Sequence, residues 1–303
     1  MSSNSRFLMC VPDHYRVDYV INPWMEGNVQ ETSPRHVTRQ WQLLSCAIHE
    51  RARVELIRSE AGWPDMVFTA NAGLVAGRTV VLSRFRHQER QGEEPFFRQW
   101  FEAQDYKVHE LPVEVSFEGA GDALFQGDER WLWAGYGFRT TRDSHAYLAR
   151  WLDVEVISLR LIDPRFYHLD TCLCPLSGGY LLYYPPAFST YSNQLIEQRV
   201  PSSKRIPVGT ADALAFACNA VNIGTDLILN QASNHLKQRL AQLGFHVMET
   251  PLTEFLKAGG AAKCLTLCLA EPSYSTEDVG CKQGYVCANS SRRHFLSSDH
   301  HER

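Results

Sequence analysis

One cysteine of this chain lies where a nucleophile could be presented to a substrate. Cys264 follows a run of glycines and alanines in GGAAKCLTLC, directly before a short apolar segment that predicts a strand. A thiol nucleophile needs a lowered pKa and a proton-transfer partner, usually a histidine distant in sequence. His168 is the best candidate among the twelve histidines, because a strand entry at YHLDT would place it on one face with Asp170. A buried structural cysteine and a structural histidine are the alternative interpretation.

Carboxylates form a second group that could take part in chemistry. Glu118 and Asp122 lie among glycines in FEGAGDAL, where no lysine or arginine is near in sequence to pair with them. Together with Asp65 and Asp170 they predict an acidic centre, which is costly unless a cation binds there. A planar guanidinium suits such a centre, because it donates paired hydrogen bonds to carboxylates and its charge favours an ionised thiol nearby.

These residues recur at one position of a repeated pattern. Hairpin-like segments begin at Asn71, Asp122, Asp170 and Asn219, which are separated by about 50 residues. A similar step reaches Asn22 in one direction and Cys264 in the other. Helix-like segments with a 3.6-residue period (33–52, 94–106, 143–152 and 234–245) and short apolar strands (54–57, 107–111, 155–159 and 246–250) follow the hairpins.

The repeating unit is therefore strand, strand, helix, strand, present about five times. Residues 1–25 and 261–270 are expected to share one closing unit. Because a closed ring leaves no free sheet edge, we expect an α/β fold whose repeat-opening residues face a common centre. An open α/β sheet with even spacing is the alternative.

Bulk composition excludes several classes of function. The chain of 303 residues has a net charge of −4 without a basic stripe, so neither nucleic acid nor a membrane surface is expected as a partner. The N-terminus lacks a secretory signal pattern, and nine scattered cysteines do not resemble a disulfide framework, which favours the cytoplasm. The paired cysteine spacing of a zinc site is absent, so no metal is expected. The glycine-rich motifs of nucleotide-binding sites are absent as well.

Three motifs in this order, FEGAGDAL, YHLDT and GGAAKCLTL, resemble the guanidine-modifying enzyme superfamily of arginine deiminases, dimethylarginine hydrolases and amidinotransferases. The resemblance covers residues 6–270 and implies a five-bladed α/β-propeller (the pentein fold) without metal or organic cofactor. Longer segments, among them PDMVFTANAGLV and RWLWAGYGFRT, are similar to the cyanobacterial-type arginine dihydrolase module. That similarity implies hydrolysis of L-arginine to ornithine, carbon dioxide and two molecules of ammonia.

The resemblance also implies roles for the matched residues. Cys264 would be the nucleophile, His168 the general acid/base and Glu118 its carboxylate partner. Arg90 and Arg139 match residues expected to hold the α-carboxylate. The other substrate contacts would come from Asp65, Asp170, Asn71, Asn22 and the backbone at Ala258.

Asn71 departs from the deiminase and dimethylarginine hydrolase pattern, in which this hairpin usually begins with a carboxylate. A carboxylate is left poorly paired against a neutral ureido group, at a loss of about 1–3 kcal/mol. An asparagine offers a donor and an acceptor, so that it can hold first a guanidine and then a urea, and Asn22 can do the same from another side. We therefore expect two successive attacks by Cys264, through a citrulline-like intermediate.

Several alternatives stay open at this point. A dimethylarginine hydrolase or a deiminase would stop at citrulline, an amidinotransferase would pass the amidino group to an amine, and a non-catalytic arginine-binding module would carry an inert thiol of high pKa. Residues 1–270 are expected to form the catalytic domain, and 271–303 a polar, flexible tail at about the place where related longer chains continue into a second domain. L-Arginine is the expected partner, and a homo-oligomer is left open.

Overall fold

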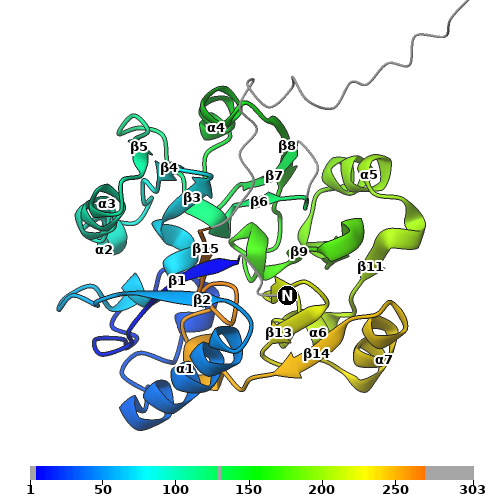
Figure 1. Cartoon of the computed structure of the whole chain (residues 1–303), viewed down its shortest axis with the longest axis horizontal. Helices are drawn as coiled ribbons and strands as arrows, with labels where there is room; N and C mark the ends of the chain where they lie inside the picture. Colours follow the sequence, from blue (N-terminus) through cyan, green and yellow to red (C-terminus); the bar gives the residue numbers. More distant parts are fainter. Residues whose placement is uncertain (1–4, 128–130, 270–303) are drawn as a thin grey trace, which may run out of the picture.

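The computed structural model describes residues 5–127 and 131–269, so the predicted tail at 271–303 lies outside the described residues. Helices and strands alternate along this part of the chain, as expected for the α/β class. The strands form three-stranded sheets, five of them within the described residues. Figure 1 shows these sheets distributed around a common centre.

Four of the sheets repeat one connectivity in chain order. The first two strands form an antiparallel hairpin, and the third strand returns after a helix to lie parallel to the second. These sheets are β3 (Gly73–Ala76), β4 (Thr79–Leu82) and β5 (Lys107–His109); β6 (Ala123–Phe125), β7 (Trp131–Tyr136) and β8 (Glu155–Arg160); β9 (Leu173–Leu176), β10 (Tyr180–Tyr183) and β11 (Arg205–Pro207); and β12 (Val221–Ile223), β13 (Asp226–Leu229) and β14 (His246–Glu249). The predicted strand–strand–helix–strand unit is confirmed.

The fifth sheet joins the two ends of the described chain. Strand β1 (Arg6–Cys10) pairs antiparallel with β15 (Leu267–Cys268) and parallel with β2 (Arg53–Ile57). Phe7 lies opposite Cys268 in the antiparallel pair. The prediction that the N-terminal and C-terminal segments share one closing unit is therefore confirmed.

The expectation that Asn22 opens a repeat is wrong. Asn22 lies in the loop after β1, where its side chain accepts a hydrogen bond from Trp24 N at 2.9 Å and caps the short 3-10 turn Pro23–Met25. The reason is that the chain enters the closing sheet at its second strand, and the first strand of that hairpin comes from the other end. Cys264 therefore opens the closing hairpin, and a step of one repeat back from Asn71 reaches an unrelated loop.

The helices confirm the predicted periodicity with one omission. The four expected helices are α1 (Pro34–His49), α3 (Glu94–Ala103), α4 (Ser144–Leu152) and α7 (Asn234–Gln242). A fifth, α5 (Thr190–Arg199), was not predicted, because it buries only Ser192 and Ile196 and has no continuous apolar stripe. Short helices α2 (Gln88–Gln91), α6 (Thr210–Leu214) and α8 (Thr253–Leu256) complete the set for the described residues.

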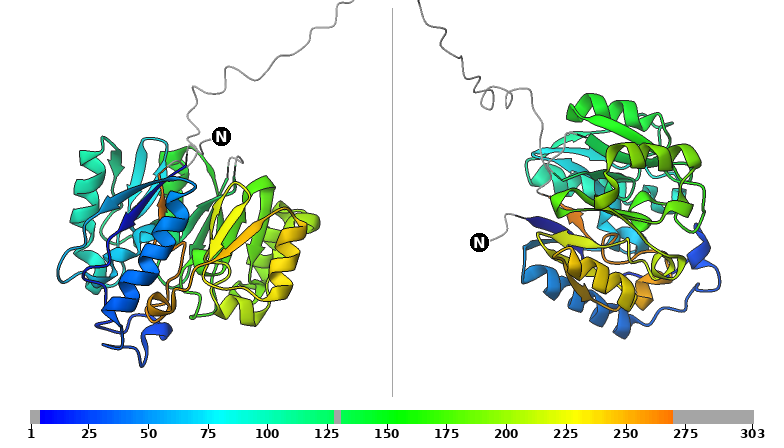
Figure 2. Two further views of the ribbon diagram at one scale, coloured as in Figure 1. Left: turned by 60° about the horizontal axis from the view of Figure 1, so that its bottom comes forward. Right: turned by 90° about the vertical axis from the view of Figure 1, so that its right-hand side faces the viewer.

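The views in Figure 2 place the long helices on the outside of the sheets. Their apolar faces cover the sheets, with Phe97 and Phe101 of α3 and Leu148 of α4 fully buried in the core. Burial of such a side chain contributes about 1.5–3 kcal/mol. In the part of the chain that the structure describes, no helix is long and apolar enough to cross a membrane.

Hydrogen bonds between neighbouring sheets connect the turns that open the five hairpins. Each bond joins one hairpin opening to the next, and together they return to the start: Ala70 N to Cys264 O (3.1 Å), Asn71 Nδ2 to Glu118 O (3.0 Å), Leu169 N to Asp122 Oδ1 (3.0 Å), Asn219 Nδ2 to Asp170 O (3.0 Å) and Cys264 N to Asn219 Oδ1 (3.1 Å). We call these five turns the inner ring. These bonds fix the relative positions of the residues that the sequence spacing predicted to open the hairpins.

Candidate active site

The inner ring borders a small cavity that brings distant parts of the chain together. Most of the predicted site residues form its wall: Asn22, Asp65, Asn71, Arg90, Arg139, His168, Ala258 and Cys264. Glu118 and Asp170 lie directly behind this wall, in contact with His168 and Cys264 respectively. We call this cavity the catalytic pocket.

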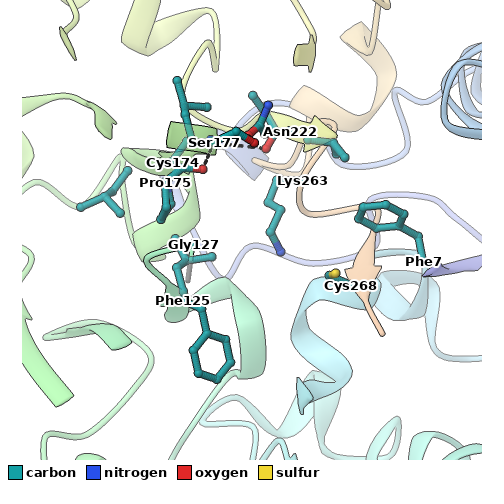
Figure 3. A pocket seen from close by; sticks show the side chains of 14 residues that line it. Phe7, Phe125, Gly127, Cys174, Pro175, Ser177, Asn222, Lys263 and Cys268 are labelled. Carbon is teal, nitrogen blue, oxygen red and sulfur yellow. Dashed lines mark hydrogen bonds between the residues drawn. The ribbon is translucent and has the colours of Figure 1, made fainter. Parts of the chain in front are cut away.

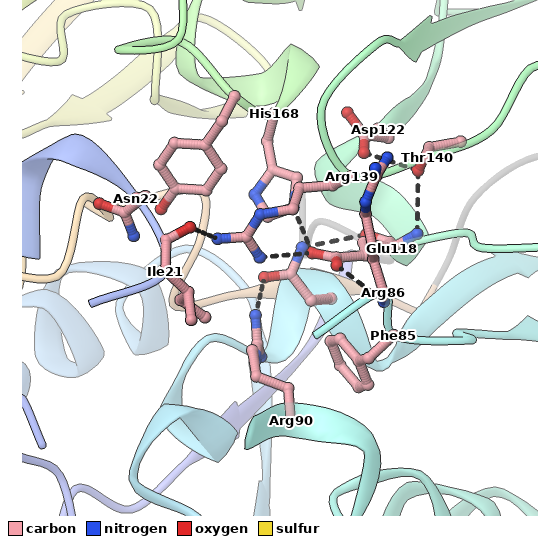
Figure 4. Close-up of polar contacts among 12 residues, drawn as sticks. Ile21, Asn22, Phe85, Arg86, Arg90, Glu118, Asp122, Arg139, Thr140 and His168 are labelled. Carbon is pink, nitrogen blue, oxygen red and sulfur yellow. Dashed lines mark hydrogen bonds and ion pairs between the residues drawn. The ribbon is translucent and has the colours of Figure 1, made fainter. Parts of the chain in front are cut away.

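A buried imidazole–carboxylate pair forms one side of the catalytic pocket. His168 Nε2 lies 2.6 Å from Glu118 Oε2, and Arg139 Nη1 donates to the same oxygen at 3.1 Å (Figure 4). Burial acts to raise the pKa of Glu118, but the charges of Arg139 and His168 hold that pKa well below its usual range. Glu118 is therefore an ionised carboxylate that fixes the orientation of the imidazole, as a general acid/base requires.

The thiol of Cys264 lies against an acid on another side. Its Sγ is 3.6 and 3.7 Å from the two carboxylate oxygens of Asp170. Burial, and then the charge of Asp170, raise the pKa of Cys264 well above its usual value, and burial raises the pKa of Asp170 to about 7. This differs from the lowered pKa expected of a nucleophile. Both causes are ones that a bound cation would offset, because a positive charge favours the ionised forms of the thiol and the acid.

The side chain of Asn219 holds both of these groups, a role that the sequence did not reveal. Its Nδ2 donates to Cys264 Sγ at 3.1 Å and to Asp170 O at 3.0 Å, and its Oδ1 accepts from Cys264 N at 3.1 Å and from Ala261 N at 3.2 Å. Its place at a hairpin opening, like that of Asn71, was the signal that could have identified it.

Asn71 and Arg90 form a second fixed unit. Arg90 is buried and makes a two-point ion pair with Glu93, at 2.9 and 2.8 Å, while its Nη1 donates to Asn71 Oδ1 at 2.9 Å. Asn71 Nδ2 in turn donates to the carbonyl of Glu118 at 3.0 Å. Glu93 was missed, although its position three residues after Arg90 on a helical segment is a recognisable signal.

Asp65 lines the catalytic pocket and has one carboxylate oxygen without a hydrogen-bond partner among the described residues. Tyr19 donates its hydroxyl to Asp65 Oδ2 at 3.0 Å, but the buried Oδ1 has no hydrogen-bond partner among the described residues. Burial raises the pKa of Asp65 above its usual range. A buried carboxylate oxygen in this state is suited to a cationic ligand, since unpaired buried charge is costly.

The guanidinium of Arg139 crosses the catalytic pocket above Tyr167. Its Cζ lies 4.6 Å from the ring centroid, and its Nη2 donates to the carbonyl of Ile21 at 3.0 Å. Tyr167 in turn donates its hydroxyl to the carbonyls of Gly259 and Ala258, at 2.9 and 3.2 Å. The aromatic ring therefore connects the arginine to the loop before Cys264.

That loop, 258–260, needs glycine at Gly259. Its φ is +79°, and a Cβ there would lie 2.8 Å from the Tyr167 hydroxyl oxygen. Asn22 Nδ2 donates to Ala258 O at 3.0 Å, so that Asn22 fixes the loop as well as lining the catalytic pocket. Tyr167 was not predicted, although it directly precedes His168.

Two expectations about the acidic centre are corrected by the structure. Asp122 does not line the catalytic pocket; it accepts hydrogen bonds from Thr140 Oγ1 at 2.7 Å and Leu169 N at 3.0 Å, and burial raises its pKa to about 6. The expected strand entry at His168 is instead a 3-10 turn, Leu169–Thr171. His168 and Asp170 reach one site because this turn directs them to different partners, not because they share a strand face.

The arrangement supplies a thiol, an imidazole–carboxylate pair and further acids around one small cavity. Such a set can perform nucleophilic substitution at the carbon of a planar cation, with the imidazole moving protons. Within residues 5–127 and 131–269, no group of three or more histidine, cysteine, aspartate or glutamate side chains is placed to hold a metal ion.

Comparison with known proteins gives a consistent set of relatives. Residues 20–270 match a family model described as N,N dimethylarginine dimethylhydrolase, eukaryotic. The chain is 65% identical over 272 residues to the bifunctional arginine dihydrolase/ornithine cyclodeaminase ArgZ of Synechocystis sp., an alignment that covers 90% of this chain and 39% of ArgZ. It is 40% identical to an N(G),N(G)-dimethylarginine dimethylaminohydrolase of Mycobacterium tuberculosis, over 86% of this chain and 85% of that protein.

Solved structures extend the comparison to the fold. The N-terminal domain of ArgZ, as a cysteine-to-serine mutant bound to substrate, matches with a TM-score of 0.88 and 65% identity, over 89% of this chain and 99% of that one. A complex of AgrE, the corresponding bifunctional enzyme of Nostoc sp., with L-arginine matches with a TM-score of 0.89 and 63% identity, over 90% of this chain and 41% of that one. The chain spans about two fifths of the length of these two bifunctional proteins.

Proposed function

The chain belongs to the N,N dimethylarginine dimethylhydrolase family, and we propose that within it this protein is an arginine dihydrolase, which hydrolyses L-arginine to ornithine, carbon dioxide and two ammonia. The observation that carries the proposal is the catalytic pocket, where the thiol of Cys264, the His168–Glu118 pair and the unpaired oxygen of Asp65 surround one small space. The 65% identity to ArgZ and AgrE supports the choice of arginine over other guanidines.

The charges of the catalytic pocket give each part of arginine a partner. The guanidinium would lie between Asp170 and Glu118, where its charge lowers the pKa of the adjacent Cys264 thiol. The α-ammonium group would pair with Asp65 Oδ1, which is buried without a partner among the described residues. The α-carboxylate would take donors from Arg139, since a substrate guanidinium at Glu118 replaces the hydrogen bond that Arg139 makes there.

The first half of the reaction would convert the guanidino group to a ureido group. Cys264 Sγ attacks the guanidinium carbon, its proton passes to His168, and His168 protonates the amino group that leaves as ammonia. The product is an S-alkylthiouronium bound to Cys264. Water, deprotonated by His168, then attacks the same carbon and expels the thiol, which leaves a citrulline-like intermediate.

The second half repeats the attack on the ureido carbon. Expulsion of the remaining ammonia gives an S-alkylthiocarbamate, and its hydrolysis gives a carbamate that breaks down to carbon dioxide and ornithine. Asn71 serves both halves, because its amide has a donor and an acceptor where a carboxylate would offer only acceptors. Its Oδ1 already faces Arg90 and its Nδ2 faces the Glu118 carbonyl, so the amide is held in one orientation.

The five three-stranded sheets and the closed hydrogen-bonded inner ring support the further proposal that the fold is a five-bladed α/β-propeller of the pentein type. In that arrangement the catalytic pocket lies at one end of the propeller axis, and residues 1–270 form the catalytic domain. L-Arginine is the proposed partner.

A second candidate activity is dimethylarginine hydrolysis or deimination that stops at citrulline. The family model and the 40% identity to the Mycobacterium tuberculosis enzyme favour it. The test is to incubate the protein with L-arginine, and separately with dimethylarginine, and to quantify citrulline, ornithine and ammonia. We expect ornithine with two ammonia from each arginine, and no product from the Cys264→Ser variant. Stoichiometric citrulline without ornithine would refute the dihydrolase proposal in favour of this candidate.

A further inference from the structure

A second, larger cavity lies beyond the inner ring and contains a lysine. It has a volume of about 210 Å³, and among the described residues it shares no lining residue with the catalytic pocket. Strands β6, β9, β12 and β15 begin just after the hairpin openings, and their residues line it. The two cavities are therefore separated by the inner ring, with Cys264 in the wall of one and the adjacent Lys263 in the wall of the other.

Lys263 brings an ammonium group into this cavity. Figure 3 shows its side chain extending into the space between Phe125 and Cys268. Among residues 5–127 and 131–269, no carboxylate forms an ion pair with its Nζ and no side chain accepts a hydrogen bond from it. A partly buried ammonium in this situation is suited to an anionic ligand.

The rest of the wall indicates what kind of anion would fit. Apolar side chains, including Leu124, Leu173 and Val221, form much of it, and Ser177 and Asn222 contribute neutral polar groups. Among the residues that the structure describes, no other lysine and no arginine lines the cavity. One ammonium beside an apolar wall favours a singly charged ligand with an apolar body, because a dianion such as phosphate would leave charge unpaired on desolvation.

We propose that this second cavity binds a small organic carboxylate, whose negative group pairs with the Lys263 ammonium and whose apolar body packs on Leu173 and Val221. The binding itself does not depend on the reaction proposed for the other side of the ring. An effect on the reaction does depend on it: burial raises the pKa of both Asp170 and Cys264, and the positive charge of Lys263 offsets part of this rise. A carboxylate that neutralises this charge should therefore slow arginine turnover.

The binding is tested on the full chain with isobutyrate as the probe, by calorimetric titration. Loss of a charge-assisted hydrogen bond predicts roughly tenfold or greater weakening in Lys263→Met, whereas Lys263→Arg should bind isobutyrate nearly as well as the unmodified chain. Isobutyramide, which has the same shape without the charge, should bind the unmodified chain no better than it binds Lys263→Met. Lys263→Gln serves if Lys263→Met does not fold, as judged from its thermal unfolding.

Arg139→Met is the control for binding in the catalytic pocket. Isobutyrate binding that persists in Arg139→Met and weakens in Lys263→Met supports the proposal. Binding lost in Arg139→Met and unchanged in Lys263→Met would assign the carboxylate to the catalytic pocket, and no measurable binding to the unmodified chain would equally overturn the proposal. A chain that binds isobutyrate through Lys263 but does not turn over arginine would refute only the proposed function.

Discussion

The two cavities on either side of the inner ring differ in how their charges are paired. In the catalytic pocket Arg90, Arg139 and Glu118 are fixed by ion pairs and hydrogen bonds to other buried side chains. In the second cavity Lys263 has no ion-pair partner among the described residues, and much of the wall is apolar. The turns of the inner ring border both cavities. The difference in charge pairing therefore comes from which side chains these turns direct to each face of the ring.

The difference teaches that most of the catalytic face is organised before a substrate binds, with Arg139 as the group proposed to change its partner. Buried polar groups that satisfy one another hold a single geometry, and electrostatic catalysis depends on such preorganisation. The second cavity has few fixed polar groups and tolerates change more readily. Matched substitutions on the two faces should therefore have unequal effects.

The largest difference is expected between two asparagines, Asn219 in the inner ring and Asn222 in the wall of the second cavity. Asn219→Asp would place a carboxylate against Cys264 Sγ and remove the N–H that donates to it, which raises the pKa of the thiol further. We expect arginine turnover to fall by about 100-fold. Asn222→Asp should lower turnover by only about twofold, since its half-buried side chain contacts Ser177, Gly224 and Asp226, and a charge there acts on Cys264 only by weakening the influence of Lys263.

The measurement that separates a chemical from a structural cause is the pH dependence of alkylation at Cys264, located by mass spectrometry. A shift of the alkylation profile to higher pH in Asn219→Asp, with an unfolding midpoint near that of the unmodified chain, supports a direct effect on the thiol. An unchanged profile would mean that Asn219 acts only through folding.

A smaller effect is expected when the amide of Asn71 becomes a carboxylate. Asn71→Asp keeps the hydrogen bond from Arg90 but loses the donor to the Glu118 carbonyl, and it leaves a charge against a neutral ureido group. We expect ornithine formation to fall about tenfold while citrulline accumulates. Efficient ornithine formation by Asn71→Asp, measured as the ratio of the two products, would remove the physical reason given for the second attack.

The pH dependence of stability should report the burial of Asp170. Its pKa is raised from 3.8 to about 7 in the folded chain, so the folded state binds a proton that the unfolded state has lost. The stabilisation from this group is fully present at low pH and is lost as pH rises through the interval up to about 7. Asp170→Asn should flatten the curve of unfolding free energy against pH in this interval, which denaturant titrations at several pH values can measure.

The smallest effect is expected from a methyl group at Gly259. Gly259→Ala would strain a residue with φ of +79° and bring Cβ within 2.8 Å of the Tyr167 hydroxyl oxygen. We expect a loss of about 1–3 kcal/mol in unfolding free energy and a raised KM for arginine, because this loop lines the catalytic pocket. Gly244→Ala is the matched control: its φ is +89° but its Cβ would contact nothing, so only the strain of about 1–2 kcal/mol should remain, with KM unchanged.

The repeat, the hairpins and most of the catalytic pocket could be predicted from the sequence, for a physical reason. In a closed ring of repeats, equivalent residues lie at the same distance from the central axis. The regular spacing of the hairpin-opening residues therefore predicts that they lie around the inner ring: Asn71, Asp122, Asp170 and Asn219. The spacing does not predict which of these side chains face the catalytic pocket. Asp122 points instead to Thr140 and a backbone N–H, an outcome that depends on packing between sheets.

Three features could not be predicted because they depend on contacts far apart in the chain. Asn22 was placed in the ring by counting, although the chain enters the closing sheet at its second strand. Tyr19 and Tyr167 act through hydroxyl groups that meet Asp65 and the loop at 258–260 only after folding. The raised pKa of Cys264 likewise follows from burial and from Asp170, which no local motif expresses.

The most direct measurement follows the guanidino carbon itself. L-Arginine labelled with ¹³C at that carbon is incubated with the full chain and observed by NMR over time, alongside the Cys264→Ser variant. The account predicts that the label passes through a ureido signal and ends as carbon dioxide and bicarbonate, with no change in the variant. A label that remains in citrulline, or that is lost equally fast without the thiol, would contradict it.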